Sequence, residues 1–236
     1  MTPGATARIL ADLAAVASER EARAADPGLG ARVEAVKRYQ QRRFEKSYAD
    51  LLAHPRYAGA ASFFLDELYG PNDFTRRDEQ FARVVPPMVH LFPSEVVQTV
   101  EALAALHALS ERFDTSMGRA LESTAVDARS YVRAWLQCDD AAGREKQIVL
   151  MERVGRSLDV LTRRPMLRHS LRLMRGPARA AGLGALQAFL EAGFDTVRSM
   201  RGAGDFLALI GKRERALATA LFASSPEDAV RIGELP

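Results

Sequence analysis

The sequence predicts an all-α protein, a compact bundle of about ten helices joined by short turns. Ala, Leu and Arg, which are strong helix formers, dominate the composition. No stretch alternates β-branched and polar residues as a half-buried strand would. Proline, glycine and paired aspartates interrupt the helical pattern at short intervals. The predicted breaks are Asp26-Pro27-Gly28, His54-Pro55, Gly70-Pro71, Pro86-Pro87, Pro93, Asp139-Asp140, Arg164-Pro165, Gly176-Pro177, residues 202–204 and Ser225-Pro226.

Two long, charged helices are predicted first, over residues 5–25 and 29–53. The first carries Ile9, Leu13 and Val16 at helical spacing, so one of its sides is apolar. That side could pack on the body of the protein or on a second copy of the chain. We therefore treat the pair as a segment that could be peripheral.

The central helix is predicted over residues 94–121. Ser94 at its start and Glu95 in its first turn suit a helix N-terminus. One side carries Val96, Val100, Leu103 and His107, and an adjoining stripe carries Leu106, Leu109 and Phe113. A surface helix needs only one apolar stripe, so two stripes indicate a helix contacted from two sides.

The last long helix is predicted over residues 206–222, which are amphipathic, and Ser225 with Pro226 begins a final short turn. No join is long or polar enough to serve as a domain linker. We therefore expect a single domain over residues 1–236, with 1–53 as the N-terminal pair and 224–236 as a tail that frays after the turn.

Composition indicates a soluble, cytoplasmic protein. Cys138 is the only cysteine, so an intramolecular disulfide is impossible. Asp12 and Glu19 interrupt the N-terminal apolar stretch, unlike a secretory signal, and no run of about eighteen uncharged apolar residues predicts a membrane span. A net charge of +3 does not by itself indicate nucleic acid. The 29 arginines against 4 lysines, with 40 alanines, suit a bacterial genome rich in G and C.

Residues 55–81 are rich in aromatic and acidic side chains. Phe63-Phe64, Leu68-Tyr69-Gly70, Asp73 and Arg77-Asp78 form a pattern that resembles a family of uncharacterised bacterial proteins. The resemblance extends from about residue 38 to the C-terminal helix. It implies an all-helical cytosolic protein and no reaction, cofactor or partner.

A small-molecule pocket is one hypothesis for this segment and the central helix. His107 is the best histidine candidate, because Glu111 follows one helical turn later and could orient its imidazole. The speculative ligand-binding residues are Tyr57, Tyr69, Asp73, Asp78, His90, His107 and Glu111. No cofactor is predicted, although haem on His90 or His107 stays open. The alternative is structural: aromatic residues fill the core, acids pair with arginines, and His107 is a satisfied core histidine.

The sequence leaves catalysis undecided and favours a protein that is not an enzyme. A carboxylate-bridged di-iron bundle needs Glu three residues before a histidine, and no histidine of this sequence has one, so that class is excluded. The sequence also has no zinc, nucleophile-elbow or phosphate-loop motif. No metal site or catalytic residue is predicted. Asp66, Asp73 and Asp78 beside His107 could transfer protons, although no recognised spacing supports this.

An arginine stripe supports the leading hypothesis, a non-enzymatic binding or regulatory protein that engages an anionic or acidic protein partner. Arg164, Arg168, Arg172 and Arg175 recur along one helix side, and no acidic residue lies between Asp159 and Glu191. The alternatives are a solvated surface or pairing with acids of other helices. Sequence-specific DNA binding is disfavoured, because the following helix has few side chains able to read bases. A second basic stretch spans residues 32–46.

Overall fold

The computed structural model describes residues 4–67, 74–233 and 235–236. In these ranges the chain forms twelve α-helices, a final 3-10 helix and no strand, which confirms the predicted all-α bundle. The helices are α1 Ala5–Ala25, α2 Pro27–Ser47, α3 Ala49–Leu52, α4 Ala58–Glu67, α5 Thr75–Leu91, α6 Ser94–Ala120, α7 Ala128–Cys138, α8 Ala141–Thr162, α9 Pro165–Leu173, α10 Arg175–Ala180, α11 Gly184–Ser199, α12 Gly204–Ala223 and η1 Pro226–Arg231. No described helix has the length and apolar character needed to cross a membrane.

Local chemistry accounts for several helix starts. The carboxylate of Asp26 accepts a hydrogen bond from the Leu29 amide, and Pro27 occupies the first helical position of α2. Asp127 and Ser130 form a reciprocal capping box at α7. The Ser225 side chain caps η1, as the sequence predicts.

Two predicted breaks differ from the structure. Pro86 and Pro87 do not end a helix: both lie inside α5, which continues to Leu91. The helix continues there although neither proline can donate a backbone hydrogen bond. Pro177 lies inside α10, and the chain bends at Met174 instead of at Gly176-Pro177. The predicted helix 29–53 is divided at Tyr48 into α2 and α3.

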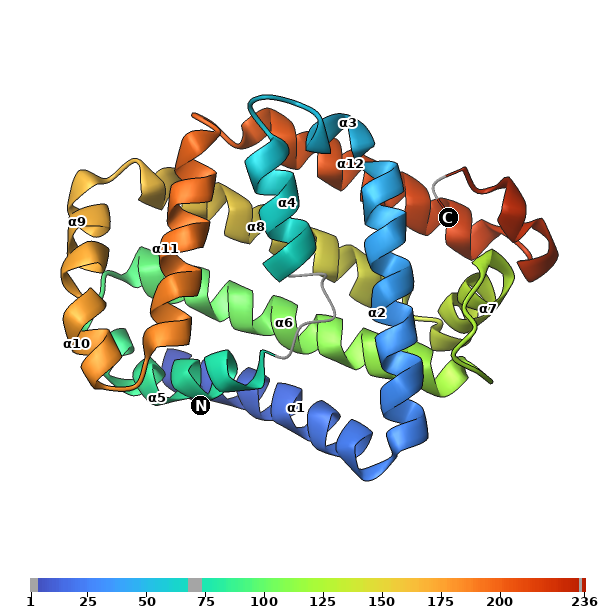
Figure 1. The fold of residues 1–236 in the computed structure, drawn as a ribbon, viewed down its shortest axis with the longest axis horizontal. Coiled ribbons are helices and arrows are strands. Elements are labelled where there is room, and N and C mark those ends of the chain that lie inside the picture. Colours follow the sequence, from blue (N-terminus) through green and yellow to red (C-terminus); the bar gives the residue numbers. More distant parts are fainter. Residues whose placement is uncertain (1–3, 68–73, 234) are drawn as a thin grey trace.

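Helix α6 lies at the centre of the molecule, as predicted (Figure 1). Helices α1 and α8 pack along it, and α2, α4 and α11 cross in front of α6 and α8. The N-terminal pair is integrated into this body, because Ile9 and Val16 of α1 and Val36 of α2 are buried. The fold therefore has two layers of helices, with α6 in the layer behind α2, α4 and α11 (Figure 1).

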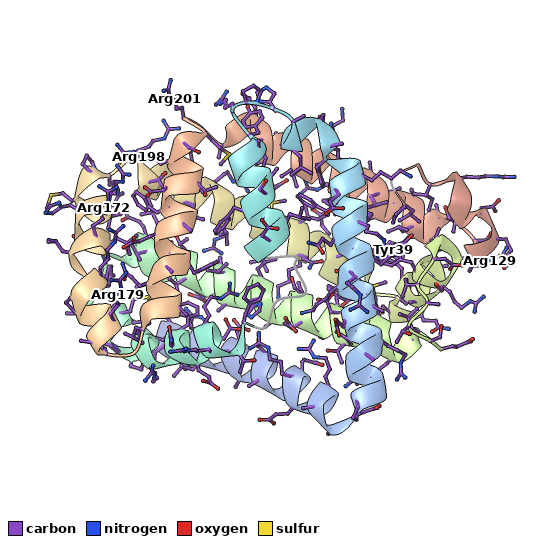
Figure 2. All side chains as sticks on the ribbon, viewed as in Figure 1. Tyr39, Arg129, Arg172, Arg179, Arg198 and Arg201 are labelled. Carbon is purple, nitrogen blue, oxygen red and sulfur yellow. The ribbon has the colours of Figure 1, made fainter. Side chains whose placement is uncertain are left out.

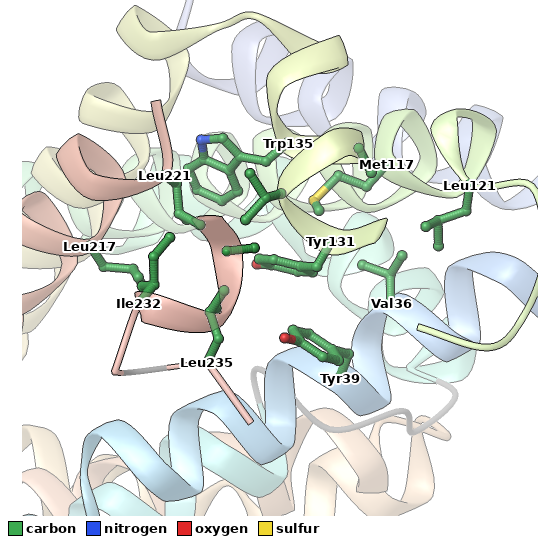
Figure 3. Close-up of a cluster of buried hydrophobic side chains, with 13 residues drawn as sticks. Val36, Tyr39, Met117, Leu121, Tyr131, Trp135, Leu217, Leu221, Ile232 and Leu235 are labelled. Carbon is green, nitrogen blue, oxygen red and sulfur yellow. The ribbon is translucent and has the colours of Figure 1, made fainter. Parts of the chain in front are cut away.

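The C-terminal segment packs against the body instead of fraying. Figure 3 shows Ile232 and Leu235 in a cluster with Tyr39, Tyr131 and Trp135. The rings of Tyr39 and Tyr131 stack with centroids 4.6 Å apart. Burial of these apolar side chains holds residues 226–233 and Leu235 on α2 and α7.

The crossing of α2 and α6 depends on Gly118. A Cβ atom at this position would lie 2.4 Å from Val33 Cγ2 and 3.2 Å from the Val33 amide nitrogen. We expect Gly118→Ala to reduce the free energy of unfolding by about 1–3 kcal/mol, because the helices must move apart. Urea denaturation measures the change.

Gly59 provides the matched control, since nothing lies within 4 Å of a Cβ built there. Gly59→Ala should leave the stability unchanged or raise it by up to about 1 kcal/mol, because alanine favours a helix over glycine. Equal stability of the two variants would contradict the close crossing.

Candidate functional site

A row of polar side chains on α6 forms the floor of an internal cleft. His107, Ser110, Glu111 and Asp114 follow one another at the three- and four-residue spacing of one helix side, and all four line the cleft. Polar groups in the middle of a bundle require hydrogen-bond or ionic partners. Each of these partners comes from a different helix.

Asp78 of α5 holds the imidazole of His107. The distance from His107 Nε2 to Asp78 Oδ2 is 2.7 Å. Arg20 of α1 lies 2.7 Å from the same oxygen, and Arg77 lies 3.4 Å from the other. Burial would raise the pKa of Asp78, but the hydrogen bond from His107 and the positive charges of Arg20 and Arg77 lower it to about 2. The carboxyl is therefore ionised at neutral pH.

Glu111 is paired with two cations of the N-terminal helices. Arg23 Nη2 lies 2.5 Å from one carboxylate oxygen of Glu111, and Lys37 Nζ lies 2.8 Å from the other. Burial would raise the pKa of Glu111, but these charges lower it to about 2. Burial raises the pKa of the neighbouring Asp114, whose carboxylate lies 3.7 Å from Lys37. The predicted Glu111–His107 contact is thus replaced by Asp78–His107.

Helices α2, α7, α8 and α12 complete the polar end of the cleft. The guanidinium of Arg144 lies between two rings, 3.8 Å from the centroids of both Phe113 and Trp135. Gln147 Nε2 donates to Ser110 Oγ over 2.8 Å. At the α12 wall, Arg43 and the Tyr48 hydroxyl each lie 2.5 Å from Glu214 Oε1. Every one of these groups is fixed in position by a neighbour.

The cleft changes character along α6. Its volume is about 170 Å³. The end beside α5 and α11 is apolar, and its walls include Phe81, Val100, Leu103, Leu106, Leu186 and Phe189. A second, more open hollow between α1 and α5 shares Lys37, Phe74 and Glu111 with the cleft. The cleft thus adjoins a surface hollow next to its charged groups.

Three predicted ligand-binding residues meet at this site: Asp78, His107 and Glu111. Tyr57 lies elsewhere, stacked on His54 with ring centroids 4.6 Å apart and packed against Phe206. His90 is exposed near the end of α5 and does not line the cleft. Tyr69 and Asp73 lie outside the described residues. Sequence reasoning missed Arg144, Gln147 and Glu214, because nothing local connects them with α6.

The predicted anion-binding arginines are mostly paired within the fold. Arg164 lies 3.1 Å from Glu95, Arg168 lies 2.8 Å from Asp195, and Arg175 lies 2.5 Å from Glu191. Arg172 is exposed and forms no ion pair with a described residue. The second basic stretch, on α2, lies far from α9 (Figure 1). In the described ranges, no cluster of three or more His, Cys, Asp or Glu side chains is arranged to hold a metal ion.

Comparison with known proteins gives a family. A family model described as a domain of unknown function, DUF8198, matches residues 19–228. The chain belongs to this family. Neither a curated protein nor a solved structure matches the chain. The DUF8198 match spans α2 to α12 and therefore contains the polar row of α6 with its partners.

The low pKa values of Asp78 and Glu111 predict a loss of stability in acid. Because both values are lower in the folded chain than the ordinary 3.8 and 4.5, this stabilisation is present above about pH 5 and is lost as the pH falls toward 2. Glu111→Gln should lower the free energy of unfolding near pH 7 by about 3 kcal/mol. The difference in the free energy of unfolding between this variant and the wild type should narrow toward pH 2. Denaturant titration across this pH range measures it.

Glu145→Gln is the matched control, because Glu145 pairs with Arg215 on the half-exposed surface. Loss of this ion pair should change the free energy of unfolding by no more than about 1 kcal/mol. If Glu111→Gln lowered the free energy of unfolding by the same amount at every pH, this result would contradict the assignment of Glu111 as an ionised carboxylate.

Proposed function

We propose that this protein is a small-molecule-binding protein that holds a compact ligand in the α6 cleft. The observation that carries the proposal is the combination, in one cleft, of an apolar end and a row of convergent polar groups. Ligand sites of proteins commonly have this composition, with a few placed polar groups among apolar walls.

The polar groups are already held in position. His107 is held by Asp78, Ser110 by Gln147, and Glu111 by Arg23 and Lys37. A ligand that enters such a site does not need to order these side chains, so less of the interaction energy is lost to entropy. This arrangement supports a binding role for the cleft.

The volume indicates a small ligand. A cavity of about 150 Å³ accommodates one benzene molecule, and the cleft measures about 170 Å³. The ligand therefore has about one ring and a short polar group. The size, and the engagement of His107 Nε2 by Asp78, favour a ligand smaller than haem.

The charges favour an anionic head group. Four cations and four acids among the described residues line the cleft: Lys37, Arg43, Arg77 and Arg144, and Asp78, Glu111, Asp114 and Glu214. Burial raises the pKa of Asp114 and thus favours the neutral form of this carboxyl. A singly charged anion would then restore the balance of charge.

The low pKa of Asp78 indicates that this carboxyl positions His107 and does not itself transfer protons. A carboxyl with a pKa of about 2 remains ionised near neutral pH and does not carry protons there. The pair of Asp78 and His107 thus serves to position the imidazole.

The leading hypothesis from the sequence, an anionic or acidic partner bound by the arginine stripe, has weaker support than the cleft. Three of the four arginines of the stripe form ion pairs within the fold.

We extend the proposal to origin and location. The excess of arginine over lysine, with 40 alanines, supports a bacterial source. One cysteine supports a cytoplasmic location. The pattern of Phe63-Phe64, Leu68-Tyr69-Gly70, Asp73 and Arg77-Asp78 is proposed as a mark of the family.

Three matched probes test the proposal: benzoate, benzyl alcohol and benzylamine. Trp135 is the only tryptophan and lines the cleft, so its fluorescence can report binding. At about 0.3 kcal/mol for each of about nine non-hydrogen atoms, benzoate should bind with a Kd of about 10 mM or lower. Benzylamine should bind at least about tenfold more weakly, a difference of about 1.4 kcal/mol.

Two leucines of α6 supply the variant and its control. Leu106→Phe fills part of the cleft and should abolish benzoate binding, whereas Leu109→Phe changes a similar side chain that does not line the cleft. Circular dichroism verifies that both variants fold. Failure of all three probes to bind, or retained binding in Leu106→Phe, would refute the proposal. Equal binding of benzoate and benzylamine would refute the charge assignment alone.

A further inference from the structure

Helix α9 exposes large apolar side chains to solvent. None of its residues is buried, and Met166 and Leu173 are 77% and 65% exposed, followed by Met174 at 51%. Of its two arginines, Arg168 contacts Asp195 of α11 and Arg172 is exposed. A surface helix normally buries its apolar stripe and exposes its charges. On α9, Leu167 and Leu171 are half-buried, whereas Met166 and Leu173 stay exposed beside Arg172.

The exposed apolar side chains of the molecule gather at this end. Leu91 and Phe92, in the turn between α5 and α6, are 78% and 44% exposed. The ion pair of Arg164 with Glu95 holds the start of α6 beside the start of α9. Five of the eight large apolar side chains that are exposed in the described ranges thus belong to α9, to Met174 after it or to the turn between α5 and α6, and these segments lie at one end of the fold (Figure 1). Single exposed apolar residues are ordinary, but a group of them marks an interaction site.

The same end carries positive charge that the fold does not balance. Arg172, Arg179, Arg198 and Arg201 form no ion pair with any residue that the structure describes. The nearby acids Asp159, Glu95, Asp195 and Glu191 are each paired with another arginine. Figure 2 shows these four arginines along one edge of the molecule. This end of the molecule therefore carries exposed apolar side chains together with arginines that the described residues leave without an ion pair.

We propose that this surface, formed by α9, α10 and the end of α11, docks an acidic amphipathic helix of a partner protein. Methionine, phenylalanine and arginine are enriched at protein interfaces, and lysine is depleted. The forked guanidinium group also suits paired contacts with carboxylates. Met166 and Leu173 are seven residues apart, which matches apolar anchors two turns apart on a facing helix. The proposal is independent of the α6 cleft.

A labelled model peptide tests the proposal by fluorescence anisotropy. The probe is a helix-forming peptide of leucine and glutamate, about 18 residues long so that it can form a stable helix. The control peptide has lysine in place of every glutamate. We expect the acidic peptide to bind with an affinity that falls as salt is added, and the basic peptide to remain unbound.

Surface variants locate the binding site. Arg172→Glu with Arg179→Glu should weaken binding of the acidic peptide at least about tenfold, or about 1.4 kcal/mol. Met166→Ser with Leu173→Ser should do the same, because the apolar anchors are lost. The matched controls are Arg129→Glu, at the opposite end of the molecule in Figure 2, and Val149→Ser, on α8. Both controls should bind as the wild type does.

Vesicles separate a protein partner from a lipid surface. Vesicles of phosphatidylcholine with phosphatidylserine are tested by co-sedimentation against pure phosphatidylcholine. Binding to the anionic vesicles without binding to the acidic peptide would overturn the proposal and assign the surface to lipid. Absence of binding to either probe, or peptide binding that the α9 and α10 substitutions leave unchanged, would also overturn it.

Discussion

The compensation of buried acids on and around α6 is the constraint on which the rest of the structure depends. Glu111 and Asp78 lie inside the bundle as ions, and an unpaired buried ion would be strongly destabilising. Arg20 and Arg23 of α1 and Lys37 of α2 supply the opposite charges. The ion pairs therefore set where these helices lie against α6, in addition to the apolar contacts of Ile9 and Val36.

The same constraint explains why a cleft persists in the bundle. Apolar side chains alone would rearrange to fill an empty space, because protein interiors are close-packed. Side chains held by Asp78, Gln147 and Glu214 cannot move into the cleft without breaking charged or polar contacts. Two walls of different character, one apolar and one ionic, thus meet along α6 and leave space between them.

Much of the fold follows from local sequence signals, whereas most of the site does not. The bounds of α1 and α6 follow from helical periodicity and from the prolines close to their ends. His107 stands out on its helix for the same reason. Its partner Asp78 lies 29 residues away, and Gln147 and Glu214 lie farther still, so only the packing of helices brings them together. The directions of Arg168 on α9 and Arg175 on α10 depend equally on Asp195 and Glu191, which no local pattern reveals.

The exposure of α9 also makes this end of the molecule sensitive to oxidation. Met166 and Met174 are open to solvent, whereas Met117 and Met200 are almost completely buried. Conversion of an exposed methionine to its sulfoxide replaces an apolar side chain with a polar one. Oxidants would therefore alter the character of the α9 surface first and leave the interior methionines intact. A reversible chemical modification thus acts on one end of the protein while its core stays unchanged.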